Sequence, residues 1–153
     1  MTLIGLVGCS SGDKPKDLPP LYPCTLTIIQ DGASLAEATV EFVPAVPSKY
    51  RPASLTGEDG TVSMRTYGFP GVPAGKYKVV VSKEIRENLV YTDTINPSTG
   101  QKEVVSFTRY QTVEPQYSSA DSSPHEIEIT GKEKVRQTFD VGKAVRTEVQ
   151  SSQ

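Results

Sequence analysis

Few side chains of this sequence have the types and spacing that chemistry requires. The chain holds two cysteines, Cys9 and Cys24, and a single histidine, His125. A Ser-His-Asp site would need His125, yet no serine lies in a G-x-S-x-G turn that would present it as a nucleophile. A metal site built from several histidines is excluded by the same count. The sequence therefore predicts no catalytic residue, no metal ligand and no cofactor.

Carboxylates offer one alternative site. Glu58 and Asp59 are adjacent, and Asp93 or Asp121 would have to join them as oxygen ligands of a calcium ion. No spaced D-x-D-x-D pattern accompanies them. A tight turn explains the pair better, because an Asp followed by Gly hydrogen-bonds to the nearby backbone and favours turns.

Cys9 follows eight apolar or small residues and precedes a polar stretch rich in proline. Residues 6–9, Leu-Val-Gly-Cys, resemble the bacterial lipobox, whose cysteine is acylated and becomes the mature N-terminus. Two or three acyl chains would anchor the protein stably to a membrane. No Lys or Arg precedes the run, so this interpretation also expects a basic extension upstream of Met1. The alternatives are an apolar strand with a buried Cys9 and a Cys9–Cys24 disulfide.

Four residues are candidate ligand contacts, because they cluster near two expected loops: Tyr50, Arg51, Tyr67 and Phe69. Aromatic rings beside a guanidinium group can stack on sugar rings or on partner peptides. The alternative is that these side chains only cap one end of the domain.

Composition limits the class of protein. At 153 residues the chain is long enough for one domain with one hydrophobic core. Twelve Pro, twelve Gly and no Trp favour short strands and turns over long helices. A net charge of −2 gives no reason to expect binding to nucleic acid. No apolar run reaches the length of a transmembrane helix.

Hydrophobic residues alternate with polar ones in several short segments, which is typical of half-buried strands. The strands expected from this pattern lie at 24–28, 38–42, 62–66, 76–82, 104–107, 125–130 and 135–141. Asp59-Gly60 predicts a hairpin turn, since Gly tolerates the positive φ of a primed turn. Six or seven strands without a confident helix predict an all-β, antiparallel β-sandwich.

The expected domain organisation follows from these segments. The parts are a partial lipoprotein signal at 1–9, a flexible tether at 10–23, the β-sandwich at 24–141 and a disordered tail at 142–153. Within the sandwich, 83–124 shows weak periodicity and is expected to be a long loop region, which usually means function or disorder.

Three segments of the chain resemble the motifs of a known family of domains. Residues 31–44 resemble the D-G-x-P-L-x-G-A-x-V-x-F-x-P opening of carboxypeptidase regulatory-like domains. Residues 52–60 are similar to the T-D-x-D-G turn that follows, and 72–79 to the x-P-x-G-x-Y-x-V strand. Three departures occur: Ala33-Ser34 replaces Lys-Pro, Glu37 replaces Gly, and Gly57 replaces Asp. The resemblance extends over roughly residues 24–141 and is closest to small lipoproteins of planctomycete-like bacteria.

The resemblance implies a seven-stranded, transthyretin-like or prealbumin-like (Ig-like) sandwich without catalytic machinery of its own. The expected function is a structural or protein-interaction module, held at the bacterial cell envelope by a lipid on Cys9, periplasmic or at the cell surface. Its partner would be a membrane through the lipid anchor and an envelope protein or polysaccharide. A glycan-binding domain that uses loops 67–75 and 83–124 is the alternative, and a small hydrolase or metal enzyme is disfavoured by the single histidine.

Overall fold

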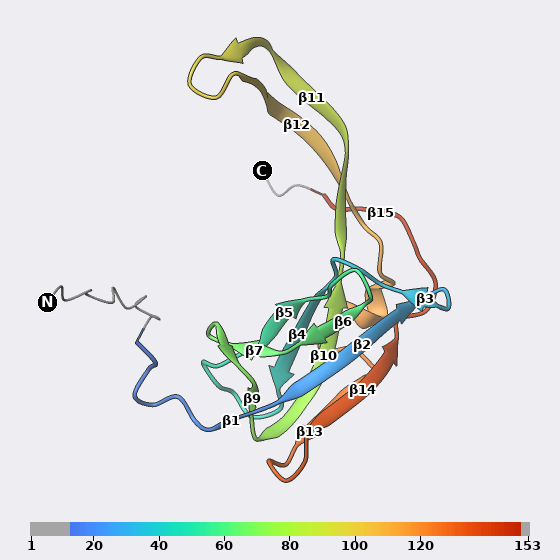
Figure 1. The fold of residues 1–153 in the computed structure, drawn as a ribbon. Helices are drawn as coiled ribbons and strands as arrows, with labels where there is room; N and C mark the ends of the chain where they lie inside the picture. Colours follow the sequence, from blue (N-terminus) through green and yellow to red (C-terminus); the bar gives the residue numbers. More distant parts are fainter. Residues whose placement is uncertain (1–12, 151–153) are drawn as a thin grey trace, which may run out of the picture.

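The computed structural model describes residues 13–150, and this part of the chain is all-β (Figure 1). Its one helical element is a short 3-10 turn, η1 (Pro115–Tyr117). The expected lipobox with Cys9 lies outside the described residues. No helix in the described range is both long and apolar enough to cross a membrane.

Two sheets form the body of the molecule. The first is antiparallel, and its strands in spatial order are β5 (Ala53–Leu55), β4 (Thr39–Pro44), β10 (Gly75–Ser82) and β13 (Glu126–Ile129). The second is built around β2 (Cys24–Gln30), whose partners are β14 (Val135–Asp140), β3 (Ala33–Ser34) and β6 (Thr61–Ser63). The pairing of β14 with β2 is parallel, so the expectation of a purely antiparallel sandwich was wrong at this place.

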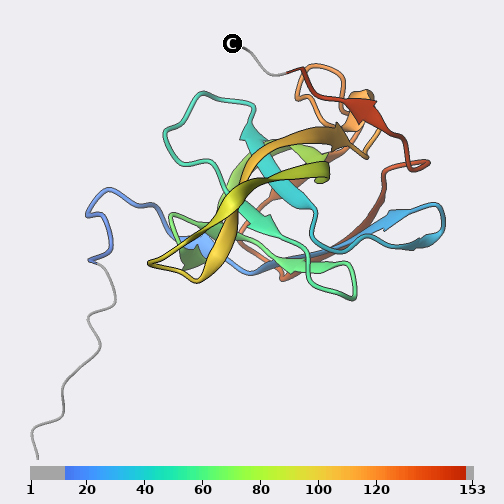
Figure 2. The same ribbon diagram turned by 90° about the horizontal axis from the view of Figure 1, so that it is seen from above.

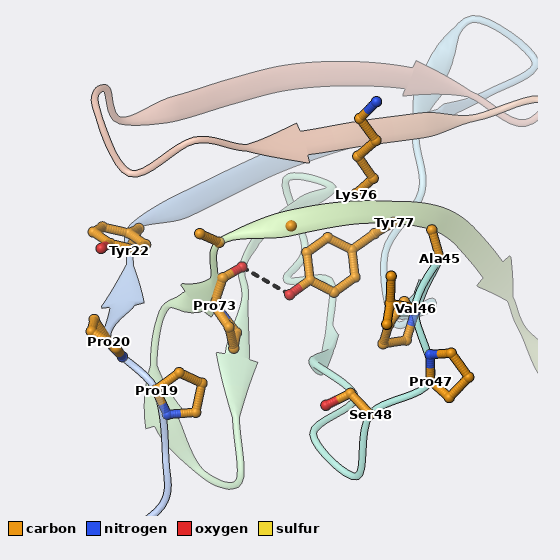
Figure 3. Close-up of a pocket in the computed structure, with 13 residues that line it drawn as sticks. Pro19, Pro20, Tyr22, Ala45, Val46, Pro47, Ser48, Pro73, Lys76 and Tyr77 are labelled. Carbon is orange, nitrogen blue, oxygen red and sulfur yellow. Dashed lines mark hydrogen bonds between the residues drawn. The ribbon is translucent and has the colours of Figure 1, made fainter.

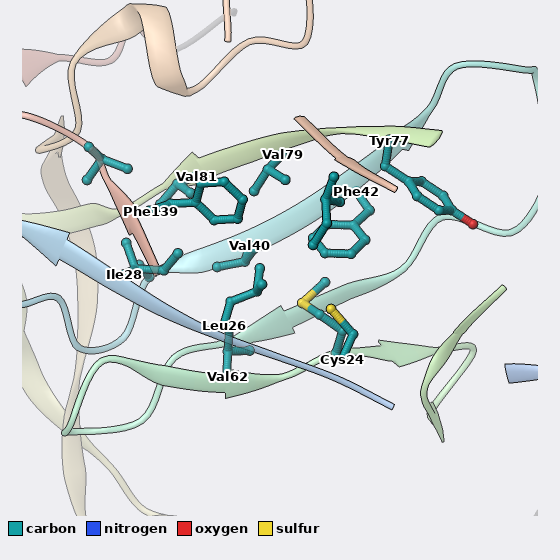
Figure 4. Packing of buried hydrophobic residues seen from close by; sticks show 14 of the residues in the cluster. Cys24, Leu26, Ile28, Val40, Phe42, Val62, Tyr77, Val79, Val81 and Phe139 are labelled. Atoms are coloured by element: carbon teal, nitrogen blue, oxygen red, sulfur yellow. The ribbon is translucent and has the colours of Figure 1, made fainter. Parts of the chain in front are cut away.

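The core lies between the two sheets and confirms the alternation seen in the sequence. Leu26 and Ile28 of β2 face Val40 and Phe42 of β4, while the intervening residues of both strands are more exposed (Figure 4). Val79 of β10 joins them from the same sheet as β4. Fully burying each such side chain stabilises the fold by about 1.5–3 kcal/mol.

Two Asp-Gly turns have different roles. Asp31-Gly32 closes the hairpin of β2 and β3 as a two-residue turn, with φ angles of 52° and 73°. Asp59-Gly60 does not join paired strands: β5 pairs with β4 in the first sheet, and β6 pairs with β2 in the second. The hairpin expected there was wrong, because a turn's dipeptide dictates local backbone angles and not the sheet that the next strand joins.

Residues 83–124 are not a long loop region, which corrects the expectation from their weak periodicity. Most of them form a hairpin of β11 (Glu84–Asn96) and β12 (Gln101–Gln111), and the strand expected at 104–107 is the middle of β12. The hairpin, called the arm below, extends away from the sandwich (Figure 1). Figure 2 views it from above, with the arm directed toward the reader and the sandwich behind it.

The base of the arm is fixed to the sandwich. The Gln30 side-chain amide donates to the Thr112 carbonyl at 2.8 Å, and Lys83 Nζ donates to the Ala36 carbonyl at 2.7 Å. Val113, directly after the arm, is fully buried. The arm therefore begins and ends at points that are hydrogen-bonded or packed, although its strands leave the body.

The expected tether and tail are more ordered than the sequence indicated. Within 10–23, β1 (Leu21–Tyr22) pairs with β9 (Val72–Pro73). Within 142–153, β15 (Thr147–Glu148) pairs with the base of β12. The described parts of both segments therefore belong to the folded domain.

Candidate functional site

Three of the four candidate ligand contacts lie together on one side of the sandwich. The rings of Tyr50 and Tyr67 meet edge to face, with centroids 5.4 Å apart. Phe69 lines the same groove as Tyr67. Arg51 points elsewhere and forms an ion pair with Glu41 of β4. The expected grouping of aromatics with Arg51 was wrong in this respect.

Tyr67 occupies an unusual backbone position. It is the first residue of the two-residue turn between β7 (Arg65–Thr66) and β8 (Phe69–Pro70), with φ of 54°, and Gly68 follows at 81°. A bulky side chain rarely adopts this left-handed conformation, which suits Gly, Asn or Asp. The ring is nevertheless 66% exposed. Strain of this kind, kept at an exposed aromatic residue, is typical of a functional position.

The groove beside Tyr67 has a volume of about 560 Å³. Its other lining residues include Asp13, Arg65 and Phe69, and Lys14 Nζ lies 5.8 Å from the centre of the Phe69 ring. Arg65 is held in place because its Nε donates to the Gly68 carbonyl at 3.1 Å. The groove thus combines the exposed ring of Tyr67 and the half-buried ring of Phe69 with both signs of charge, which suits a polar ligand with a flat apolar face.

The N-terminal segment is bound to this region through Asp17. The Tyr50 hydroxyl donates to Asp17 Oδ1 at 2.6 Å, and Lys49 forms an ion pair with the same carboxylate. Hydrogen bonds from Lys49 and Tyr50 lower the pKa of Asp17, and the bond to Asp17 raises the pKa of both Lys49 and Tyr50. These contacts fix the ring of Tyr50, against which Tyr67 packs.

A second concavity, of about 450 Å³, lies where the N-terminal segment meets the ends of β4 and β10 (Figure 3). Prolines dominate its wall: Pro19, Pro20, Pro44, Pro47 and Pro73. Tyr77 also lines it, but its hydroxyl is engaged by the Pro73 carbonyl at 2.8 Å. This groove was not predicted from the sequence, because its prolines come from distant segments that converge only in the folded chain.

His125 packs against aromatic side chains of the fold. Its ring stacks on the Tyr117 ring with centroids 5.3 Å apart, and its centroid lies 4.8 Å from that of the Phe139 ring. Its Nε2 lies 2.7 Å from the Asp140 carbonyl. The ring therefore connects η1, β13 and β14.

Two further groups considered for chemistry are engaged in the fold. Asp59 accepts hydrogen bonds from the backbone N–H of Thr61 at 3.0 Å and from its hydroxyl at 2.7 Å, as the turn interpretation expected. Cys24 is buried in the core, and burial raises its thiol pKa to about 11. Across residues 13–150, no three His, Cys, Asp or Glu side chains are grouped so as to hold a metal ion.

The most distinctive surface belongs to the arm. Seven large apolar side chains on its two strands are between 39% and 60% exposed: Leu89, Val90, Tyr91, Ile95, Val104, Val105 and Phe107. Its turn is polar, with the sequence Asn-Pro-Ser-Thr-Gly-Gln at 96–101. The arm therefore carries an apolar middle between a polar tip and a braced base. The weak periodicity of this stretch was the only sequence signal of it.

Comparisons with known proteins add no family. No protein-family model matches the chain, and no curated protein matches it in sequence. A solved structure that resembles it weakly is a 9R-lipoxygenase from Cyanothece PCC8801, with 16% identity and a TM-score of 0.34. The likeness covers 88% of this chain but only 18% of that protein. It carries no argument about this chain.

Proposed function

We propose that the protein is a non-catalytic interaction module of the bacterial cell envelope, which binds another protein through its arm. The observation that carries this proposal is the exposed apolar middle of β11 and β12. Roughly 600 Å² of apolar side chain is open there, if a fully exposed aromatic side chain presents about 150–250 Å² and an aliphatic one somewhat less. This area is divided between the two faces of the arm, because Val90 and Tyr91 are successive residues of one strand. Exposed apolar patches of a few hundred Å² on soluble proteins are often functional.

The arm suits protein better than lipid. A hairpin that inserts into a membrane needs an apolar tip, whereas residues 96–101 at the tip are polar. The arm's charges are also mixed, with four acidic and three basic side chains between 84 and 111, so it has no basic patch for anionic headgroups.

The sandwich itself is proposed to be of the carboxypeptidase regulatory-like, transthyretin-like type. Its two sheets contain seven strands if the two-residue β3 is not counted. This number agrees with the seven strands of that type of sandwich and supports the proposal. Further support comes from the Asp31-Gly32 turn and from Tyr77, since both fall at the motif positions of the resemblance. Such a domain would display the arm and carry out no reaction.

The lipid anchor at Cys9 is part of the proposal and has its own test. Cells that express the full gene are labelled with an alkyne fatty acid, and the protein is compared with a Cys9→Ser variant. We expect label on the first and none on the second. Equal labelling of the two would show that Cys9 is not the anchor.

The interaction itself is tested by photo-crosslinking in the cells that make the protein. A photoreactive amino acid at position 105, in the middle of the arm, should give a protein adduct. The same amino acid at Glu133, an exposed position in the turn between β13 and β14, is the control. The absence of adducts from the arm would contradict the proposal.

A glycan-binding role is the second candidate, and Tyr67 favours it. Its exposed ring, held at a strained turn above a groove with Arg65 and Asp13, resembles the aromatic platforms on which sugar rings stack. A glycan array separates the two roles. Binding that is lost in Tyr67→Ala, but kept in an arm variant such as Val104→Glu, would assign glycans to this groove.

A further inference from the structure

The groove beside Tyr67 lies at the point where the described chain begins. Asp13 and Pro15, among the first residues that the structure describes, line this groove together with Tyr67. The segment is held there because the Asp17 carboxylate accepts a hydrogen bond from the Tyr50 hydroxyl at 2.6 Å. The groove is therefore built in part from the chain that leads to the N-terminus.

The groove is also close in sequence to the proposed lipid anchor. Asp13 follows Cys9 by four positions. A fully extended chain spans at most about 3.3–3.6 Å per residue, so the Cα atoms of these two residues cannot be more than about 14 Å apart. Acyl chains on Cys9 would hold its backbone at the surface of the bilayer. The wall of the groove at Asp13 must then lie within the same short distance of the membrane, whatever conformation residues 10–12 adopt.

Tyr67 has the chemistry of a residue at a membrane interface. Its ring is 66% exposed at the two-residue turn between β7 and β8. Tyrosine combines an apolar ring with a polar hydroxyl and is enriched where the apolar core of a bilayer meets water. The Tyr50 ring packs edge to face against it and limits its directions, and Phe69 adds apolar surface in the same groove.

The charges around the groove are mixed, with a small basic excess. Asp17 and Lys49 form an ion pair and neutralise each other. The other charged residues of segment 13–17 and of the groove lining are Asp13, Lys14, Lys16 and Arg65. Three of these four are basic, which favours the phosphate groups of lipids only weakly. The position of the groove next to the anchor, more than its charge, therefore decides what it contacts.

We propose that the groove beside Tyr67 is the surface through which the protein rests on the membrane, with the rings of Tyr67 and Phe69 among the lipid headgroups. The inference rests on the lipid anchor at Cys9, which is part of the proposed function, and adds the orientation of the domain on the bilayer. The headgroup region then takes the place of the glycan considered above as the ligand of this groove.

This orientation leaves the arm free for a protein partner. Residues 13–20 lie on the side of the sandwich that carries β7 and β9, whereas the arm leaves the sandwich in another direction (Figures 1 and 2). Membrane contact at Tyr67 and protein binding at the arm therefore use separate surfaces.

The test uses tryptophan as a fluorescent reporter, because the chain contains none. The acylated full chain with Tyr67→Trp is purified from the cells that make it and reconstituted into vesicles of phosphatidylcholine and phosphatidylglycerol, with or without bromine on the acyl chains. Bromine quenches a tryptophan that touches the lipid. We expect the emission to shift to shorter wavelength on reconstitution and to lose most of its intensity in the brominated vesicles.

Val105→Trp is the matched control. Val105 is 60% exposed, close to the 66% of Tyr67, but it lies in the arm. The emission of a tryptophan at position 105 should be the same with and without bromine. Phe69→Trp is a second reporter in the groove, which keeps the test open if Tyr67→Trp does not fold, and it should be quenched as at position 67.

The possible failures are distinguishable. An acylated, vesicle-bound protein with no quenching at position 67 or 69 would overturn the inference and leave the anchor in place; glycan binding that is lost in Tyr67→Ala would then assign the groove to glycans. Quenching at position 105 as strong as that at position 67 would overturn the inference and the protein-binding role of the arm together. A protein without acyl chains on Cys9 would overturn the inference and the anchor together.

Discussion

Glu37 is a residue whose replacement by glycine should make the protein more stable. It has φ of 56°, in the left-handed region, and it lies in the connection between β3 and β4. This conformation costs a non-glycine residue about 1–2 kcal/mol. Glycine adopts it freely, but its greater freedom in the unfolded chain costs roughly 0.5–1 kcal/mol. The Glu37 side chain is exposed, and its backbone N–H donates to the Thr56 carbonyl at 3.1 Å, a bond that glycine retains.

Glu37→Gly should therefore increase the free energy of unfolding by about 0.5–1 kcal/mol. Each kcal/mol gained should raise the melting temperature by about 2–4 °C. The matched control is Glu58→Gly. Glu58 is also exposed, but its φ is not positive, so the same substitution should destabilise by about 0.5–1 kcal/mol. Urea unfolding monitored by circular dichroism measures both. Equal destabilisation by the two substitutions would refute the reasoning from φ.

Three further predictions concern the core, the N-terminal contact and the buried thiol. Phe42→Ala should lower the free energy of unfolding in urea by about 3–5 kcal/mol, because Phe42 is fully buried between the sheets. A smaller loss than that caused by Phe69→Ala, at a half-buried position, would contradict the assigned core. The pKa of Asp17 is lowered in the folded state, so its contacts should stabilise the fold above the unfolded pKa and be lost as pH falls through the lower folded pKa. An NMR titration of the Asp17 carboxyl carbon should have its midpoint below 3.8. The Lys49→Ala substitution should raise this midpoint. Cys24, with a pKa of about 11, should resist a thiol reagent at pH 8 in the folded protein and react in denaturant, with peptide mapping to assign the label.

The central strands were predictable because burial on one side imposes a period of two. The expected strands at 24–28, 38–42 and 76–82 correspond to β2, β4 and β10. Burial alternates along β2 and the first part of β4, whereas in β10 Val79, Val80 and Val81 are all buried. Pairing was not predictable in the same way. The parallel contact of β14 with β2 depends on which sheet edge is open to β14 in the folded chain, and no local sequence pattern contains that information.

The candidate site was predictable only in part. Tyr50, Tyr67 and Phe69 were expected together because all three lie near expected loops, but Tyr50 is buried, with only 6% exposed. The position of Tyr67 in a strained turn was not predictable from the sequence, because Tyr-Gly is not a common dipeptide of a primed turn. Arg51 was misplaced because Glu41, ten residues earlier, approaches it only when β4 and β5 pair.

The arm escaped prediction for a reason that bears on its role. Alternation appears in a strand when one of its faces packs against a core, and the middle of the arm packs against nothing else in the described chain. Its apolar residues occur on both faces and are shifted further by bulges, so the period of two disappears. A conflict between sequence pattern and local structure is expected where function, rather than folding, selects the residues. Apolar side chains that the fold does not use, on strands that the fold does hold in place, are what a surface for a partner requires.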